Sequence, residues 1–133
     1  MNLSLIPIGS IRSPLTDPLA APRQGPEGGP NAWIEVSERF VGGLEGLRKG
    51  QNIFLITWLH LAQRDILRVH PRDDPGAPLA GVFATRSADR PNPLGLHPVT
   101  ILQIEGSRIE VGPLEAVDGT PVLDIKPVLP AER

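Results

Sequence analysis

Proline and glycine are spread over most of the sequence, and they limit the possible folds more than any other feature. The 133 residues include 16 prolines and 14 glycines. Proline removes a backbone donor and fixes φ, and glycine weakens the interior of a helix. We therefore expect little helix and many short strands that are joined by stiff turns.

Apolar and β-branched segments between the turns predict about seven short strands. Residues 52–60, NIFLITWLH, are nearly all apolar, which is typical of a strand that is buried on both faces. Residues 98–105 and 108–111 are expected to form a hairpin, in which Ile109 and Val111 face inward. The other expected elements are strands at 3–11, 33–36, 66–69, 81–84 and 122–126, and one or two helical turns at 40–47. The sequence therefore predicts an all-β fold, a small closed or partly open β-barrel, as a single domain of residues 1–133.

Composition excludes several classes of site. The chain has no cysteine, so it forms neither disulfides nor thiolate metal sites, and His60, His70 and His97 lack the spacing of metal ligands. Phosphate-binding glycine motifs and a Gly-x-Ser-x-Gly motif are absent. Because no signal peptide or membrane-spanning run is apparent, we expect a cytoplasmic protein with no metal and no membrane contact. With a net charge of −2, contact with nucleic acid requires a local basic patch.

The segment GVFATRSADRPNPLGLHPV, residues 81–99, contains a loop that is neither helix nor regular strand. Pro91 and Pro93 stiffen it, and Arg86, Arg90 and Asn92 lie on it. Guanidinium groups bind carboxylates and phosphates in a bidentate manner, and a rigid loop loses little entropy on binding. The alternative is that both arginines only tie the loop to nearby carboxylates.

Other charged residues that could belong to a functional site also have ordinary structural explanations. Asp118 opens a turn, where aspartate commonly caps its own backbone. Asp124 is expected to share a face of the last strand with Val122 and Lys126, and an ion pair between Asp124 and Lys126 is an ordinary explanation of that pattern. The cations that would form a patch for RNA are Arg64, Arg68 and Arg72, although neighbouring aspartates can neutralise them.

Five segments occur in the order expected of the TrmO family, whose members are also called TsaA-like or YaeB-like. They are IGSIRSP (8–14), PRQ (22–24), LITWLH (55–60), GVFATRSADRPNPLGL (81–96) and VDGTPVLDIKP (117–127). The chain resembles this family over nearly its whole length. The resemblance implies a small β-barrel methyltransferase, commonly a homodimer, that uses S-adenosylmethionine. The best characterised activity of the family is N6-methylation of threonylcarbamoyl-adenosine next to the anticodon of tRNA.

The resemblance also implies which residues form the site. A guanidinium suits the carboxylate of the cofactor, and a carboxylate suits its ammonium and ribose hydroxyls. Cofactor contacts are expected at Pro22, Arg23, Gln24, His60, Leu61, Arg86, Leu96, Glu115, Ala116, Val117 and Asp118. Substrate contacts are expected at Arg90, Asn92 and Lys126. The candidates for a proton acceptor are Asp118, Asp124 and His60, and the sequence does not select among them.

The chain departs from the family pattern at several of these segments. Glu115 stands where aspartate is usual, and His97 stands where a small serine is usual. Val128 replaces an aromatic residue that could stack on a substrate base. Two alternatives to tRNA methylation follow. One is methyl transfer to another small or nucleotide substrate, and the other is a non-catalytic module that binds S-adenosylmethionine.

Overall fold

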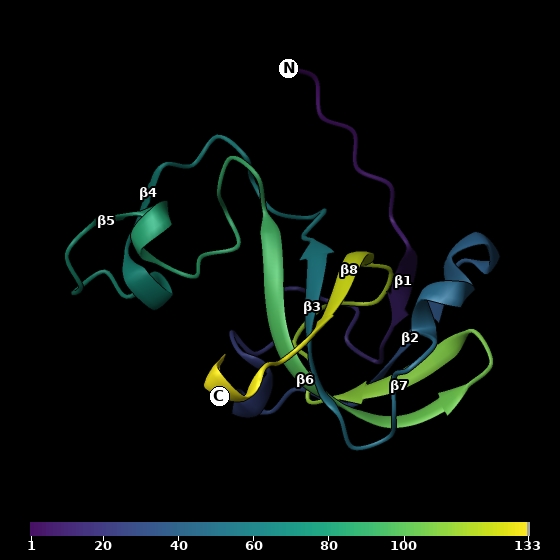
Figure 1. Cartoon of the computed structure of the whole chain (residues 1–133). Coiled ribbons are helices and arrows are strands. Elements are labelled where there is room, and N and C mark those ends of the chain that lie inside the picture. Colours follow the sequence, from purple (N-terminus) through teal and green to yellow (C-terminus); the bar gives the residue numbers. More distant parts are fainter. Residues whose placement is uncertain (133) are drawn as a thin grey trace.

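A closed antiparallel barrel forms the body of the computed structural model, which describes residues 1–132. Its strands follow the order β1-β2-β7-β6-β3-β8, and β8 pairs with β1 to complete the closure (Figure 1). Closure removes the exposed strand edges on which other chains could pair. The strands are β1 (Gly9–Arg12), β2 (Ala32–Val36), β3 (Asn52–Trp58), β6 (Leu94–Glu105), β7 (Arg108–Gly112) and β8 (Pro121–Pro127). The predicted all-β barrel is confirmed.

Helix is limited to short 3₁₀ segments, as the proline content predicts. Proline fits the first turn of a helix because its missing N–H would have no partner there, and η1 and η3 have proline at their start. In residues 1–132 the helical segments are η1 (Gly25–Glu27), η2 (Glu38–Leu44), η3 (Pro71–Asp73), η4 (Val82–Ala84) and η5 (Pro130–Glu132). None of the helices in this range has the length and apolar character needed to cross a membrane.

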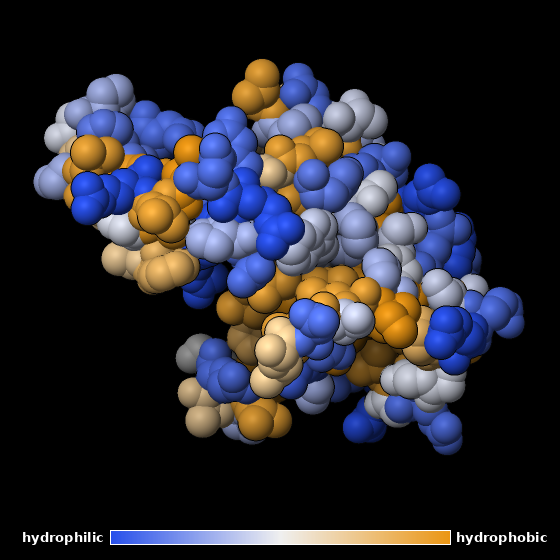
Figure 2. Space-filling model, turned by 90° about the horizontal axis from the view of Figure 1, so that it is seen from above, coloured by the Kyte–Doolittle hydropathy of each residue, from blue (hydrophilic) through white to orange (hydrophobic). Residues whose placement is uncertain are grey.

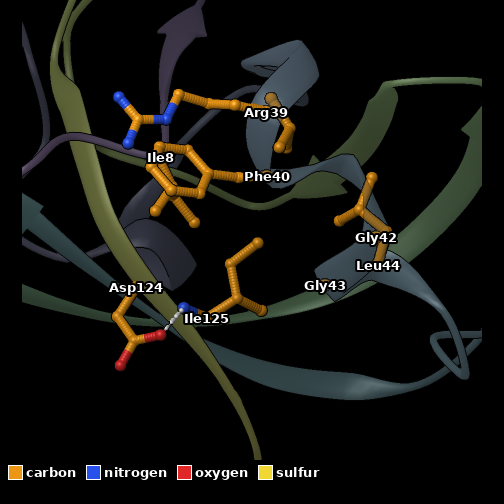
Figure 3. A pocket seen from close by; sticks show the side chains of 9 residues that line it. Ile8, Arg39, Phe40, Gly42, Gly43, Leu44, Asp124 and Ile125 are labelled. Carbon is orange, nitrogen blue, oxygen red and sulfur yellow. Dashed lines mark hydrogen bonds between the residues drawn. The ribbon is translucent and has the colours of Figure 1, made fainter.

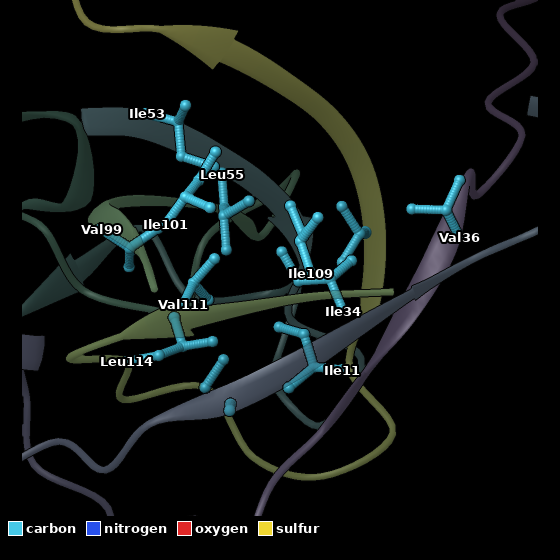
Figure 4. Packing of buried hydrophobic residues seen from close by; sticks show 13 residues of the cluster. Ile11, Ile34, Val36, Ile53, Leu55, Val99, Ile101, Ile109, Val111 and Leu114 are labelled. Carbon is cyan, nitrogen blue, oxygen red and sulfur yellow. The ribbon is translucent and has the colours of Figure 1, made fainter. Parts of the chain in front are cut away.

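The hydrophobic core fills the barrel and follows the alternation of its strands. On β3, Ile53 and Leu55 are fully buried, whereas Phe54 and Ile56 point outward and are half-buried. The expectation that this strand is buried on both faces is therefore wrong, because only one side of a barrel wall faces the interior. Figure 4 shows the inward side chains packed against one another. The core consists of Ile11, Ala32, Ile34, Val36, Ile53, Leu55, Val99, Ile101, Ile109, Val111, Leu114, Ala116 and Val122.

Several of the expected strands have different bounds in the structure. The strand expected at 3–11 is reduced to β1, and residues 3–8 precede β1 and are not part of a strand. The strand expected at 81–84 is replaced by the short β5 (Ala80–Gly81), which pairs with β4 (Arg68–Val69), and by η4. The carbonyl of Val82 accepts hydrogen bonds from the Thr85 amide at 3.1 Å and from Arg90 at 2.7 Å, so it is used in a turn.

A β-bulge changes which residues of β8 face the interior. Against β3, Asp124 pairs with Ile56 while Val122 pairs with Thr57, so Leu123 is an extra residue. Val122 is buried and Asp124 is exposed. The expected shared face of Val122 and Asp124 is therefore wrong. No ion pair joins Asp124 to Lys126 in the part of the chain that the structure describes.

Residues 59–93 leave the barrel between β3 and β6, and we call this segment the arm. It carries β4, β5, η3 and η4 and projects to one side of the barrel (Figure 1). At its base, the amide of Leu59 donates to the carbonyl of Pro93 at 2.8 Å. Viewed from above, hydrophobic residues gather around the recess between the arm and the barrel (Figure 2).

Candidate functional site

The guanidinium of Arg90 is used inside its own loop. It donates to the carbonyl oxygens of Val82 at 2.7 Å, Ser87 at 2.9 Å and Thr85 at 3.2 Å. Its partners are backbone carbonyls and not the carboxylates of the alternative interpretation. An arginine has five N–H donors, and these contacts direct both terminal nitrogens of the guanidinium toward the backbone of its own loop. Arg90 therefore holds the loop in shape and has little capacity left for a substrate.

Arg86 lies on the same loop but in a different environment. Its side chain is exposed, and no hydrogen bond or ion pair of that side chain occurs within residues 1–132. The loop beneath it is fixed by Arg90, and by the hydroxyls of Thr85 and Ser87, which accept from the amides of Ser87 and Asp89. The two arginines thus have separate roles, since one shapes the loop and the other presents a guanidinium to the outside.

Arg64 fastens this loop to the end of β3. Its Nε donates to the carbonyl of Pro91 at 2.8 Å, its Nη2 donates to the amide oxygen of Asn92 at 3.2 Å, and its guanidinium lies 5.0 Å from the centre of the Trp58 ring. The amide oxygen of Asn92 is therefore occupied by Arg64. The segment that carries His60 and Leu61, both exposed, is in this way held against the loop that carries Arg86.

Reciprocal ion pairs link the loop 22–27 to the arm. Arg23 contacts Asp73 at 2.7 Å, and Arg72 contacts both carboxylate oxygens of Glu27 at 2.8 Å. All four side chains are exposed, and such pairs contribute only about 0–1 kcal/mol to stability. Their importance is positional, because they bring the Pro22–Gln24 segment and the arm to the same side of the molecule. The sequence analysis did not anticipate that Arg23 has an acidic partner.

The same loop packs against the segment that follows β7. The amide of Leu114 donates to the carbonyl of Pro30 at 2.9 Å. Gly25 approaches so closely that an added Cβ would lie 2.5 Å from the Pro113 carbonyl oxygen and 3.2 Å from Oε2 of Glu115. The fold therefore brings Glu115, which is mostly buried, next to residues 22–27.

A buried polar chain connects Glu115 to the barrel interior. His97 on β6 contacts Oε1 of Glu115 through Nδ1, and its Nε2 lies 2.7 Å from Oγ1 of Thr57 on β3. Thr57 and His97 are both buried. Gly95 provides the necessary space, since an added Cβ there would overlap the Thr57 hydroxyl and lie 2.5 Å from Nε2 of His97. The sequence analysis missed this pair as site residues, although two polar residues on otherwise apolar inward faces are a usable signal.

Asp118 lies on the same segment as Glu115, but it is bonded to the loop that follows β1. Its Oδ1 accepts from the amide of Ser13 at 3.0 Å, and its own amide donates to the carbonyl of Leu15 at 2.6 Å. The hydrogen bond to Glu35 raises the pKa of Arg12, and the carboxylate of Asp118 adds to this effect. Asp118 therefore ties the 115–118 segment to the end of β1. Within residues 1–132 its carboxylate makes no hydrogen bond to the backbone of its own turn, which differs from the turn-capping alternative.

Asp124 and Lys126 lie on the outer face of the barrel wall, which is the opposite side from Thr57 and His97. Asp124 borders a groove of about 350 Å³ between η2 and β8, together with Ile8, Arg39 and Phe40 (Figure 3). Lys126 borders a second groove of about 390 Å³ beside Phe54 and Leu129. The structure does not bring these two residues together with Glu115. Within residues 1–132 no group of acidic or histidine side chains could hold a metal ion.

Comparison with known proteins gives consistent matches over almost the whole chain. The family model described as the tRNA-methyltransferase O N-terminal domain matches residues 10–132. A "Probable S-adenosyl-L-methionine-binding protein" of Methanothermobacter thermautotrophicus is 40% identical over 96% of this chain and 90% of the relative. An S-adenosyl-L-methionine-binding protein of Archaeoglobus fulgidus is 42% identical over 95% of this chain and 89% of the relative.

Solved structures agree with this relationship. The crystal structure of TrmO from Pseudomonas aeruginosa superposes with a TM-score of 0.78 at 34% sequence identity. The match covers 98% of this chain and 56% of the crystallised chain. The chain therefore spans little more than half the length of that structure.

Proposed function

Because the chain belongs to the family of tRNA-methyltransferase O N-terminal domains, we propose that it binds S-adenosylmethionine and transfers the methyl group of this cofactor to tRNA. The names of the Methanothermobacter and Archaeoglobus relatives support the cofactor. The observation that carries the proposal is the meeting of the loop 22–27, the arm and Glu115 on one side of the barrel. These are the segments on which the cofactor contacts were expected.

The side chains present suit the groups of this cofactor. Arg86 would bind the α-carboxylate, because its exposed guanidinium has no partner in residues 1–132 and its loop is rigid. Glu115 would accept hydrogen bonds from the ammonium or the ribose hydroxyls. Leu61 and Leu96, which are 58% and 41% exposed, would cover the adenine. The backbone of Pro22 to Gln24 and of Ala116 to Asp118 would supply further contacts, and Arg23 would have to share or leave Asp73.

The chemistry requires little covalent participation by the protein. When bound, the cofactor supplies a methyl group on a sulfonium, and alignment of an acceptor nitrogen can lower the barrier by about 7–11 kcal/mol. Among the candidates for proton acceptor, we favour His60. It is exposed at the base of the arm beside the Arg86 loop, whereas Asp118 accepts from the amide of Ser13 and Asp124 lies on the outer face.

The acceptor that we propose is N6-threonylcarbamoyl-adenosine next to the anticodon. Of the expected substrate contacts, Arg90 and Asn92 are used to shape and anchor their loop, and Lys126 lies elsewhere on the barrel. The tRNA would therefore meet other cations, of which Arg68 is exposed on the arm. Methylation of another small or nucleotide substrate stays the second candidate, because two of the expected contacts for tRNA are occupied and the third lies elsewhere.

We further propose that the protein is a homodimer that acts in the cytoplasm. The arm exposes large hydrophobic side chains, of which Phe83 is 81% exposed and Leu67 is 63% exposed. Exposed apolar groups that gather on one part of a surface commonly mark an interface. A second copy of the chain that covers the arm would bury them. Light scattering of the wild type and of a Phe83→Asp variant tests this, since the variant is expected to be monomeric.

The function is tested by incubating the protein with radiolabelled S-adenosylmethionine and total tRNA, followed by digestion to nucleosides. Label in a methylated threonylcarbamoyl-adenosine is the expected result. Label in another nucleoside or in a small molecule of a cell extract would favour the second candidate. Binding of the cofactor with no transfer of label to RNA or extract would indicate a non-catalytic binding module.

A further inference from the structure

We propose that His97 is a positioning residue, which holds the carboxylate of Glu115 in the orientation that binds hydroxyl or ammonium donors of the cofactor. The proposal rests on the proposed binding of S-adenosylmethionine. His97 itself is only 3% exposed and lies on the inward side of β6, so it acts through Glu115 and not by touching the cofactor.

The hydrogen-bond pattern defines the tautomer of the neutral ring. A carboxylate only accepts, so Nδ1 of His97 carries a proton and donates it to Oε1 of Glu115. In the neutral ring Nε2 then accepts from the hydroxyl of Thr57, which is 2.7 Å away. Because both ring nitrogens are used and Thr57 is fixed on β3, the imidazole cannot rotate without losing a buried hydrogen bond.

The arrangement leaves one oxygen of Glu115 for a ligand. His97 engages Oε1, whereas Oε2 faces the backbone of Gly25 next to the Pro22–Gln24 segment. No protein donor to Oε2 occurs within residues 1–132. The Glu115 side chain is 15% exposed, so one edge of the carboxylate remains accessible. An acceptor that is fixed on one side and open on the other suits a hydroxyl or ammonium donor.

The sizes of the side chains also support a specific role for this pair. His97 and Glu115 are 18 residues apart in the chain, and the structure places them in direct contact. The imidazole also reaches Thr57, so the three side chains form one connected unit. A serine at position 97 is too short to reach Thr57 and Glu115 at the same time.

The proposal is tested by variants that replace His97 with a side chain retaining a polar group near only one of the two ring nitrogens. His97→Asn retains an N–H near the place of Nδ1, and His97→Gln retains a polar group near the place of Nε2. We expect His97→Gln to weaken binding of S-adenosylmethionine, measured by calorimetry, about tenfold, which corresponds to the loss of one charge-assisted hydrogen bond. His97→Asn should restore most of the affinity. Glu115→Gln should also weaken binding, and adding His97→Gln to it should have no further effect.

Each outcome has a definite meaning. Wild-type affinity in His97→Gln, or independent and additive effects of His97→Gln and Glu115→Gln, would overturn the positioning role and leave the proposed function intact. Failure of the wild type to bind S-adenosylmethionine would overturn both. If His97→Gln does not fold, Thr57→Val provides the second test, because it releases Nε2 without removing the ring. A reduced affinity in Thr57→Val is expected, and an unchanged one would contradict the proposal.

Discussion

Oγ1 of Thr57 lies 2.7 Å from Nε2 of His97, across the pairing of β3 with β6 and inside the barrel. The contact depends on Gly95, which pairs with Thr57 in the register of the two strands. A methyl group at position 95 would meet both polar atoms. The pair and the glycine therefore form one unit of packing at this end of the barrel.

Gly95→Ala is expected to destabilise the protein by about 1–3 kcal/mol, because an overpacked interior forces side chains from their rotamers. It should also weaken binding of S-adenosylmethionine through the displacement of His97. Urea denaturation and calorimetry measure the two effects. Gly42→Ala is the matched control, since an added Cβ at this exposed position meets no atom within 4 Å. Equal stability of Gly95→Ala and the wild type would contradict the close packing of Gly95 against Thr57 and His97.

Arg86 and Arg90 should differ in what their loss changes. Arg86→Ala is expected to weaken binding of S-adenosylmethionine by roughly ten- to hundredfold, as a lost charge-assisted hydrogen bond of about 1.5–3 kcal/mol implies. The thermal midpoint should stay unchanged, since the side chain is exposed. Arg12→Ala, which removes an exposed arginine paired with Glu35, is the control for binding. An Arg86→Ala variant with wild-type affinity would exclude Arg86 from the site.

Arg90→Ala is expected to lower stability as well as cofactor binding. The carbonyl oxygens of Thr85 and Ser87 would lose their donor, whereas that of Val82 would keep the Thr85 amide. A buried acceptor left without a partner costs about 1–3 kcal/mol, and less when it is partly exposed. The loop that presents Arg86 would then lose its fixed shape. Limited proteolysis across residues 82–90 measures this directly. Unchanged resistance to protease would show that Arg90 does not shape the loop.

The sequence predicted the barrel well where periodicity was strong. The inward positions of β7, Ile109 and Val111, are buried as the alternation indicated. The start of β6 was not predicted correctly, since the strand was expected at 98–105 and begins at Leu94. This error concealed that His97 points inward. A strand start placed four residues earlier would have put Gly95, His97 and Val99 on one face.

The parts of the site that could not be predicted depend on contacts between distant segments. The bulge at Leu123 separates Asp124 from the inward face of Val122, and no local pattern marks it. The use of Arg90 depends on the turn at η4, which was expected to be a strand. The contacts of Arg23 with Asp73 and of His97 with Glu115 join residues far apart in the chain, and only the folded barrel brings them together.

The anchor formed by Arg64 gives a further test of the loop. Arg64→Lys keeps the charge but loses the planar fork that reaches Pro91 and Asn92 together, and it weakens the contact with Trp58. We expect the loop 85–93 to become more mobile while the barrel keeps its stability. Hydrogen exchange should increase at the Arg90 amide, which donates to Gln63, and stay constant at the β3 amides. Uniform exchange rates would contradict the anchoring role.

Docking of tRNA should depend on the cations of the arm that have no acidic partner. Arg72 is paired with both oxygens of Glu27, whereas Arg68 is exposed and makes no ion pair within residues 1–132. Each phosphate that an arginine neutralises adds about one unit to the slope of log affinity against log salt. Arg68→Ala is therefore expected to reduce this slope by about one unit and to leave cofactor affinity unchanged.

Arg72→Ala is the matched control, for which the slope should stay the same because Glu27 already neutralises its charge. Filter binding of tRNA over a salt series decides between them. A reduced slope in Arg72→Ala with none in Arg68→Ala would mean that the tRNA displaces Glu27, and it would contradict this assignment of the docking cations.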